Sequence, residues 1–298
     1  MNTIECRDLS KTFGSKTALQ DLTVAIKENT ITGVIGRNGA GKTTLLKIAA
    51  GFLQKSSGTI QVFNESPFNS LLVSANSIYI DEYVQYPPAL TLREILDHHH
   101  FFYEKWDKKL ADRLLDYFAL HPMQHHNQLS KGQKNTFNAI AGLASRCQLT
   151  IFDEPTTGMD ASVRKDFYRA LLKDYLSHPR TILLSSHHLD EIDELIEEVL
   201  LIKNGTKHLH MPVEELKEYA MGVHGPEPAL RDWMRNHHQI YKKQTRPGAA
   251  YAVVKNDFSA REKAEAVSMG LQFSAVSASD LCVYLTQPHK GGIDDVFN

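Results

Sequence analysis

The sequence predicts an α/β protein of two domains joined by a linker at residues 221–228. Two short apolar runs, at residues 31–35 and 149–155, have the length and composition of strands buried in a parallel sheet. A glycine-rich loop and an apolar segment follow the first run, which gives the strand, loop and helix order typical of α/β folds. Glycine and proline cluster at the linker. These observations assign residues 1–220 to a large α/β domain and residues 229–298 to a small α+β domain.

The glycine-rich loop at residues 36–43 reads G-R-N-G-A-G-K-T, the pattern of a P-loop. Glycines are needed because backbone N–H groups must approach phosphates closely, which side chains would prevent. Lys42 would reach the β- and γ-phosphates, and the Thr43 hydroxyl would complete a Mg²⁺ shell. The motif alone also fits an ordinary glycine-rich turn, but its strand and helix context predicts a nucleoside triphosphate site. The predicted nucleotide-binding residues here are Gly36, Arg37, Asn38, Gly39, Ala40, Gly41, Lys42, Thr43 and Thr44.

Two adjacent carboxylates, Asp153 and Glu154, follow the second apolar run. Open α/β sheets bind their ligands at the carboxyl ends of strands, so both side chains are expected near the P-loop. We expect Asp153 to hold the Mg²⁺ and Glu154 to orient or deprotonate the water that attacks the γ-phosphate. An Asp-Glu pair before proline also occurs where a strand simply turns, but the upstream P-loop favours the catalytic interpretation.

Residues 129–133 read L-S-K-G-Q and resemble the L-S-G-G-Q signature of the ATP-binding cassette (ABC) ATPase family. The resemblance covers about residues 1–215. It implies a P-loop NTPase fold of the ABC type, in which a RecA-like core carries an antiparallel β region and a helical subdomain, here at about residues 90–145. It also implies ATP and Mg²⁺ as cofactors.

In the ABC family the signature caps the γ-phosphate bound by the opposite subunit. The resemblance therefore implies a dimer closed around two ATP molecules, with Ser130, Gly132 and Gln133 as nucleotide contacts. Lys131 departs from the family glycine and places a positive charge beside the phosphates. The same residues also have the pattern of a helix N-cap followed by a solvent-facing lysine.

Three further residues match family positions. Phe13 matches the aromatic residue that stacks on adenine, although it also fits plain core packing. Asp160 matches the residue that couples the two nucleotide sites, and alone it would be a helix cap. His187 matches the switch histidine that senses the γ-phosphate. The resemblance thus implies Glu154, His187 and Lys42 as the catalytic residues.

One position breaks the family pattern. When residues 90–94 are aligned with the segment that follows the family's switch glutamine, Glu82 occupies the Mg²⁺-contacting position, and Gln85 is out of register. A glutamate still offers an oxygen ligand, but it adds negative charge near a triphosphate. The expected metal ligands are therefore Thr43, Glu82 and Asp153.

Composition narrows the class of protein. The chain has 33 Lys and Arg against 35 Asp and Glu, a formal net charge of -2, which gives no electrostatic reason to expect nucleic acid as a partner. The three cysteines lack metal or redox spacing. The first ten residues lack the apolar core of a signal peptide, and no apolar stretch reaches the roughly 18 residues of a spanning helix. Membrane contact is therefore expected only through a partner.

Several features admit two interpretations. The histidine runs, such as residues 98–100, suggest a metal site, but adjacent helical residues diverge by about 100°, so we favour ordinary surface and core positions. The aromatic residues at 101–106 fit either a partner surface or core packing. The C-terminal domain, with expected helices at 229–240, 260–269 and 279–285, fits either a regulatory module or a structural cap.

The sequence therefore predicts an ATP-hydrolysing subunit of an ABC transporter, of the bacterial exporter type. Transmembrane permease subunits would be its partners, together with a second copy or a sister ABC ATPase, and it would lie at the cytoplasmic face of the cell membrane. A soluble ABC-type ATPase acting on ribosomes or nucleic acid is the alternative. The chain lacks the second cassette or long coiled-coil insertion typical of that class.

Overall fold

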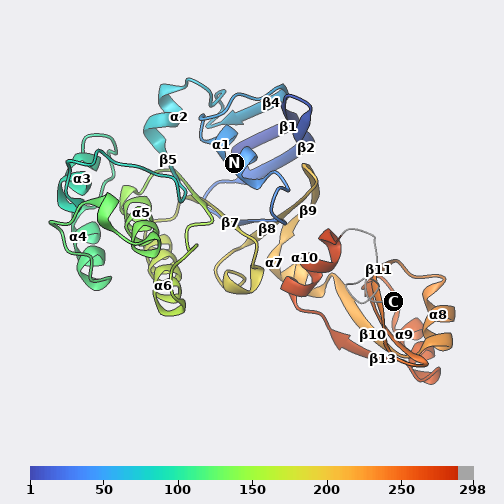
Figure 1. Ribbon diagram of the computed structural model, residues 1–298. Coiled ribbons are helices and arrows are strands. Elements are labelled where there is room, and N and C mark those ends of the chain that lie inside the picture. Colours follow the sequence, from blue (N-terminus) through green and yellow to red (C-terminus); the bar gives the residue numbers. More distant parts are fainter. Residues whose placement is uncertain (288–298) are drawn as a thin grey trace. The chain divides into compact units, whose positions relative to one another are not determined.

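The computed structural model describes residues 1–287 (Figure 1). The chain divides into two compact units, the first spanning Met1–His210 and the second beginning at Met211. In the described part, no helix is both long and apolar enough to cross a membrane.

A six-stranded sheet forms the centre of the first unit, in the order β5-β6-β7-β3-β8-β9. Neighbouring strands from β5 to β8 run parallel. Every residue of β3, β6 and β7 is buried, which is why these strands are continuous apolar runs in the sequence. The bounds are Ser77–Ile80 for β5, Leu149–Asp153 for β6, Thr181–Ser186 for β7, Ile31–Ile35 for β3, Glu198–Lys203 for β8 and Thr206–Pro212 for β9.

A second, antiparallel sheet has the order β2-β1-β4. Its bounds are Asn2–Phe13 for β1, Lys16–Lys27 for β2 and Ser57–Val62 for β4. Helix α1, Lys42–Ala49, contributes Leu45, Leu46 and Ile48 to an apolar core that also contains strand residues of both sheets. Because α1 is fixed by this core, the loop before it ends on a rigid support.

A helical subdomain is formed by α3 (Leu92–His99), α4 (Lys108–Tyr117) and α5 (Lys131–Ser145). Thr91 caps α3: its hydroxyl accepts from the Glu94 N–H, and Glu94 accepts from the Thr91 N–H. The aromatic residues at 101–106 include both core and exposed side chains. Trp106 packs against the subdomain core, whereas Phe101 and Phe102 are 79% and 70% exposed.

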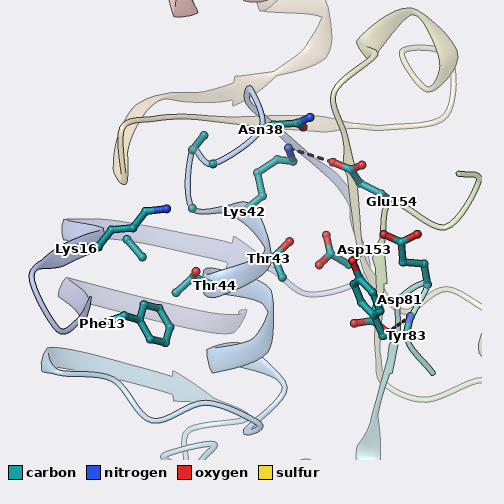
Figure 2. Close-up of a pocket in the computed structure, with 15 residues that line it drawn as sticks. Phe13, Lys16, Asn38, Lys42, Thr43, Thr44, Asp81, Tyr83, Asp153 and Glu154 are labelled. Atoms are coloured by element: carbon teal, nitrogen blue, oxygen red, sulfur yellow. Dashed lines mark hydrogen bonds and ion pairs between the residues drawn. The ribbon is translucent and has the colours of Figure 1, made fainter. Parts of the chain in front are cut away.

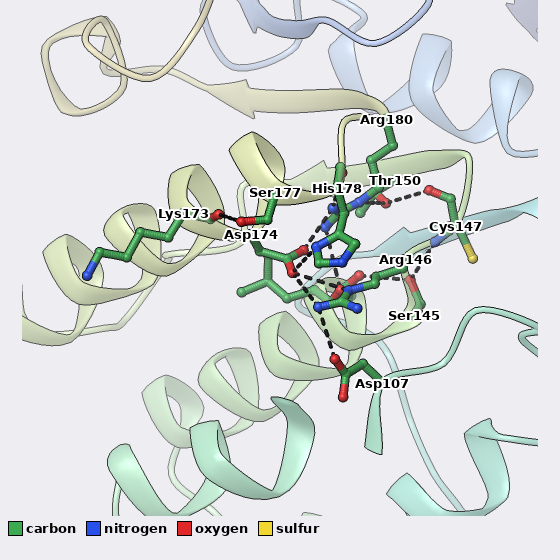
Figure 3. Close-up of polar contacts among 12 residues, drawn as sticks. Asp107, Ser145, Arg146, Cys147, Thr150, Lys173, Asp174, Ser177, His178 and Arg180 are labelled. Atoms are coloured by element: carbon green, nitrogen blue, oxygen red, sulfur yellow. Dashed lines mark hydrogen bonds and ion pairs between the residues drawn. The ribbon is translucent and has the colours of Figure 1, made fainter. Parts of the chain in front are cut away.

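A buried cluster of charges joins this subdomain to the central sheet (Figure 3). Asp174, on α6, lies 3.0 Å from the Arg146 Nη2 atom and 2.8 Å from the Arg180 Nη1 atom. Arg146 also pairs at 2.9 Å with Asp107, whose carboxylate caps α4. Asp174 thus joins the end of α5 to the start of β7, and Asp107 joins the same end of α5 to the start of α4. Helix α6 spans Ala161–Ser177; the remaining short elements of this unit are α2, Leu71–Asn76, and the 3-10 turns His126–Gln128 and Leu189–Glu191.

The second unit contains an antiparallel sheet of order β11-β12-β10-β13, covered by helices. Val223, Leu230 and Trp233 belong to its apolar core. Its elements are α7 (Val213–Glu218), β10 (Ala220–Pro226), α8 (Glu227–Met234), β11 (Gln239–Arg246), β12 (Ala249–Lys255), α9 (Ala260–Ser268), β13 (Gln272–Ala275) and α10 (Ala278–Thr286).

The expected linker at 221–228 is wrong in this structure, because these residues form most of β10 and the start of α8. A Cβ atom at Gly222 would lie 2.6 Å from the Ser274 Oγ atom, so the glycine serves close packing inside the sheet. Pro228 lies in the first turn of α8, where its missing N–H is not needed. The expected helix at 229–240 is also too long, since α8 ends at Met234 and β11 follows. The unit boundary accordingly lies before β10 rather than within it.

Candidate active site

A cavity of about 670 Å³ lies at the carboxyl ends of β3 and β6 (Figure 2). It brings together the P-loop, the two adjacent carboxylates and the aromatic residue of β1, which are far apart in the sequence. Its lining residues are Phe13, Lys16, Ala18, Asn38, Gly39, Ala40, Gly41, Lys42, Thr43, Thr44, Asp81, Glu82, Tyr83, Asp153 and Glu154.

The P-loop forms one wall of the cavity. Gly41 has a φ of 109°, and a Cβ atom there would lie 2.5 Å from the Ala18 carbonyl oxygen, so only glycine fits. The Lys42 ammonium is buried and donates to the Gly36 carbonyl at 2.8 Å. Gly36 and Arg37 do not line the cavity in the described structure; Gly36 instead holds Lys42 in place.

Asp153 ends β6 with both carboxylate oxygens engaged. The Tyr79 hydroxyl donates to Oδ2 at 2.8 Å, and the Ser185 hydroxyl donates to Oδ1 at 2.6 Å. Burial, and then the nearby Asp153 charge, raise the pKa of Tyr79 above its usual range, so this phenol stays protonated as a donor. The two hydroxyls therefore fix the direction in which the carboxylate faces the cavity.

Glu154 adopts a left-handed backbone conformation, with a φ of 49°. Such a conformation in a residue other than glycine costs about 1–3 kcal/mol, and it is held here by the Glu154 N–H, which donates to the Ser185 Oγ atom at 2.9 Å. The side chain lies 3.2 Å from the Lys42 Nζ atom and 3.4 Å from the His187 Nδ1 atom. The three predicted catalytic side chains are thus brought into contact.

The opposite wall is formed by Phe13 and Lys16. The Phe13 ring is 48% exposed, which is the environment of a stacking surface rather than of a core residue. The Lys11 ammonium lies 4.9 Å from the ring centre. Lys16 also lines the cavity and adds a cation at this wall, a position the sequence pattern did not indicate.

The signature residues lie outside this cavity. Ser130 caps α5 and forms a capping box with Gln133, and Asp160 caps α6 by accepting from the Ser162 and Val163 N–H groups. Among the described lining residues, none of Ser130, Gly132, Gln133 or Asp160 is present. These four residues therefore lie outside the P-loop cavity of their own chain, and the helix-cap interpretations of Ser130 and Asp160 describe what their side chains do here.

Glu82 lines the cavity and forms an ion pair with Lys131 of the signature. The Lys131 hydrogen bond holds the pKa of Glu82 below its usual range. The two residues that depart from the family pattern are therefore in contact.

The oxygen donors of Thr43, Asp153 and Glu82 line the same cavity, and this donor set fits a hard cation such as Mg²⁺. The histidine runs do not contribute to it. His99, for example, stacks at 5.0 Å on Trp106. Within residues 1–287, no cluster of three or more His, Cys, Asp or Glu side chains is placed to hold a metal ion.

Sequence reasoning missed six residues of the site: Lys16, Ala18, Tyr79, Asp81, Tyr83 and Ser185. Ser185 lies two residues before His187 at the end of a strand, so its position offered a signal. The others are on a strand or turn whose place beside β6 or the P-loop depends on the tertiary fold.

Comparison with known proteins agrees with this geometry. Residues 19–157 match the family model described as ABC transporter, and an AAA domain model matches residues 124–193. The bacitracin transport ATP-binding protein BcrA of Bacillus licheniformis is 31% identical over 223 residues, which are 72% of this chain and 71% of that protein. The Nod factor export ATP-binding protein I of Burkholderia orbicola is 27% identical over 241 residues, 77% of this chain and 79% of that protein.

Solved structures share the fold of the first unit. The ATP-binding cassette MJ0796, in a dimeric post-hydrolysis state bound to ADP and Pi, has a TM-score of 0.61 at 19% identity. The similarity covers 70% of this chain and 98% of that one.

Proposed function

The chain belongs to the ABC transporter ATPase family, and we propose that it is the motor subunit of an exporter, working as a dimer around two ATP molecules on separate membrane-spanning subunits. The observation that carries the proposal is the position of Glu154, between Lys42 and His187 at the mouth of the P-loop cavity.

ATP is the substrate that this family hydrolyses, and the geometry suggests how each side chain takes part. Lys42 pairs with Glu154 in the single chain, and both face the place where P-loop ligands carry their γ-phosphate. When the γ-phosphate pairs with Lys42 in place of Glu154, the Glu154 carboxylate is released to accept a proton from the attacking water. His187 stays within reach of Glu154 and can hold it in position. Mg²⁺, when bound to Thr43, Asp153 and Glu82, would neutralise charge on the phosphates.

The dimer is supported by the place of the signature. Ser130 and Gly132 lie outside the chain's own cavity, so a second subunit would have to bring its signature to the nucleotide. The second subunit is either another copy of this chain or a sister ATPase. The dimeric cassette MJ0796 provides a precedent for such an arrangement on the same fold.

Export and the membrane partner are supported by the similar proteins. One is named for bacitracin transport and another for Nod factor export. We therefore infer that permease subunits bind this chain at the cytoplasmic face of the cell membrane. The alternative of a ribosome or nucleic-acid ATPase is not favoured, because the similar proteins are named as parts of transporters.

An affinity pull-down tests the proposal. Glu154→Gln should trap the closed dimer with ATP and co-purify a membrane-spanning protein from detergent-solubilised membranes. Lys42→Ala, which removes the phosphate-binding ammonium, should lose the ATP-dependent partner, whereas Glu194→Gln, an isosteric change on an exposed carboxylate, should behave as the parent. Recovery of ribosomal proteins in place of membrane proteins would overturn the transporter assignment.

A further inference from the structure

Glu82 and Lys131 lie in two different segments of the first unit and form an ion pair with each other. Glu82 follows β5 and lines the nucleotide cavity, while Lys131 is the first residue of α5 within the signature. Their side chains are 30% and 60% exposed, so the pair lies at the rim and can be exchanged for other partners. Each residue replaces a neutral one of the family pattern, glutamine at 82 and glycine at 131.

The backbone around the signature directs Lys131 toward this rim. A Cβ atom at Gly132 would lie 2.3 Å from the Gly158 carbonyl oxygen, so the signature packs tightly on the loop after β6. The Asn135 amide donates to the Thr157 carbonyl at 2.5 Å, which fixes the same contact one turn later. The Lys131 stem lies against Gly158, since a Cβ atom there would be 3.4 Å from the Lys131 Cγ atom. Lys131 therefore contacts two loops of the site, the one after β5 and the one after β6.

Charge balance explains why a lysine accompanies the glutamate. Glu82 is one of four carboxylates that line the cavity, together with Asp81, Asp153 and Glu154, and a triphosphate must bind among them. An additional unpaired negative charge would oppose that binding. Lys131 neutralises Glu82, and their hydrogen bond lowers the pKa of Glu82 and raises the pKa of Lys131, so both remain charged near neutral pH.

We propose that Glu82 and Lys131 form an exchangeable ion pair. Lys131 neutralises Glu82 within one subunit and moves to the phosphate of the opposing subunit's ATP when the dimer closes. The inference rests on the proposed ATP-bound dimer, because only there does the signature meet a nucleotide. Mg²⁺–ATP carries a competitor for each member of the pair, a cation for Glu82 and an anion for Lys131. The exchange thus links binding of Mg²⁺–ATP at a subunit's own site to the release of its signature lysine.

A double-mutant cycle tests the resting pair. In the Glu154→Gln background, ATP affinity is measured by equilibrium binding for Glu82→Gln, Lys131→Gln and the double variant, at concentrations where the chain is monomeric. Lys131→Gln should weaken ATP binding about two- to fivefold, the range of an exposed ion pair, and adding Glu82→Gln should restore it. If the effects of the two substitutions simply multiply, the pair does not neutralise Glu82 and the proposal is wrong.

Charge reversal tests the transfer. Glu82→Lys with Lys131→Glu keeps a pair at the rim but puts a carboxylate in the signature, so ATP-dependent dimerisation, followed by analytical ultracentrifugation, should weaken about tenfold or more while monomer ATP affinity changes less. The matched control reverses Asp97 and Lys108, an exposed ion pair in the helical subdomain, and should dimerise as the parent. Normal dimerisation of the reversed Glu82–Lys131 variant would overturn the transfer. If the parent stays monomeric with ATP, the proposed dimer fails, yet the affinity cycle still decides whether the resting pair exists.

Discussion

Glu154 and Asp174 each contact basic side chains, but one carboxylate lines the P-loop cavity and the other is enclosed. The Glu154 side chain is 30% exposed and contacts a lysine at 3.2 Å and a histidine at 3.4 Å. The Asp174 side chain is 6% exposed and contacts two arginines at 3.0 and 2.8 Å. Lysine and histidine can change partner or charge, whereas arginine holds a carboxylate in a fixed fork geometry. The comparison separates a cluster built for exchange from one built for position.

The largest effect is expected at the enclosed carboxylate. Asp174→Asn removes the charge that both Arg146 and Arg180 contact. Arg146 would keep Asp107, but the buried Arg180 would lose its counter-charge, which should lower the free energy of unfolding by about 3–5 kcal/mol. Urea unfolding followed by tryptophan fluorescence and circular dichroism would measure the loss. Asp107→Asn is the matched control, since asparagine keeps the helix cap and only one arginine loses a contact. Similar stability of the two variants would mean that Asp174 is not the centre of the cluster.

The open carboxylate should affect turnover instead. Glu154→Gln should lower the rate of ATP hydrolysis about a hundred- to a thousandfold, because glutamine cannot accept the proton from the attacking water. ATP binding and the free energy of unfolding should stay close to those of the parent chain. Phosphate release in steady state, with Glu194→Gln as control, would measure the effect. A large loss of stability in Glu154→Gln would erase the contrast with Asp174.

Phe13 extends the comparison to a site residue without charge. Phe13→Ala removes the exposed ring at the cavity wall and should weaken ATP binding by about 1–2 kcal/mol, while leaving stability almost unchanged. Phe13→Tyr should retain most of the affinity, because any flat ring can stack on a base. Phe102→Ala, also an exposed phenylalanine, should not change ATP affinity in equilibrium binding. Equal loss in the Phe13 and Phe102 variants would exclude stacking on the nucleotide.

The sequence allowed the α/β fold of the first unit to be predicted because its signals are local. The buried strands β3 and β6 are continuous apolar runs, and the P-loop follows the first of them directly. The second unit was less predictable, since Gly222 and Pro228 are used inside a strand and a helix rather than in a linker. Glycine and proline mark a break in the chain only where no neighbouring strand requires close approach.

The site could be predicted only in part for the same reason. The P-loop, Asp153 and Glu154 follow recognisable strands, and the cavity brings them together. By contrast, two contacts of the site join residues about 50 or more positions apart in the sequence. One is the ion pair between Glu82 and Lys131, and the other is the hydrogen bond that the Tyr79 hydroxyl donates to Asp153. No local pattern encodes such contacts, because they depend on the packing of β5 and α5 around β6.

The smallest effect on stability is expected from the buried His99–Trp106 stack, in which the histidine is favoured in its uncharged form. His99 stacks on Trp106, and its Nδ1 atom contacts the Ile95 carbonyl at 2.8 Å; burial lowers its pKa. The folded chain therefore binds fewer protons at this site than the unfolded chain, so the stabilisation is complete above the ordinary histidine pKa of about 6.5 and is lost as the pH falls through the folded value. The midpoint of urea unfolding should be measured at about pH 7.5 and about pH 5.5. It should fall at the lower pH for the parent and for His98→Gln, a change at an exposed side chain, and it should fall less for His99→Gln. If His99→Gln lost as much stability as the parent, the acid sensitivity would have to come from another group. A reduced loss would place His99 with Asp174 rather than with Glu154, as a buried side chain whose charge state is fixed by packing instead of being available for exchange.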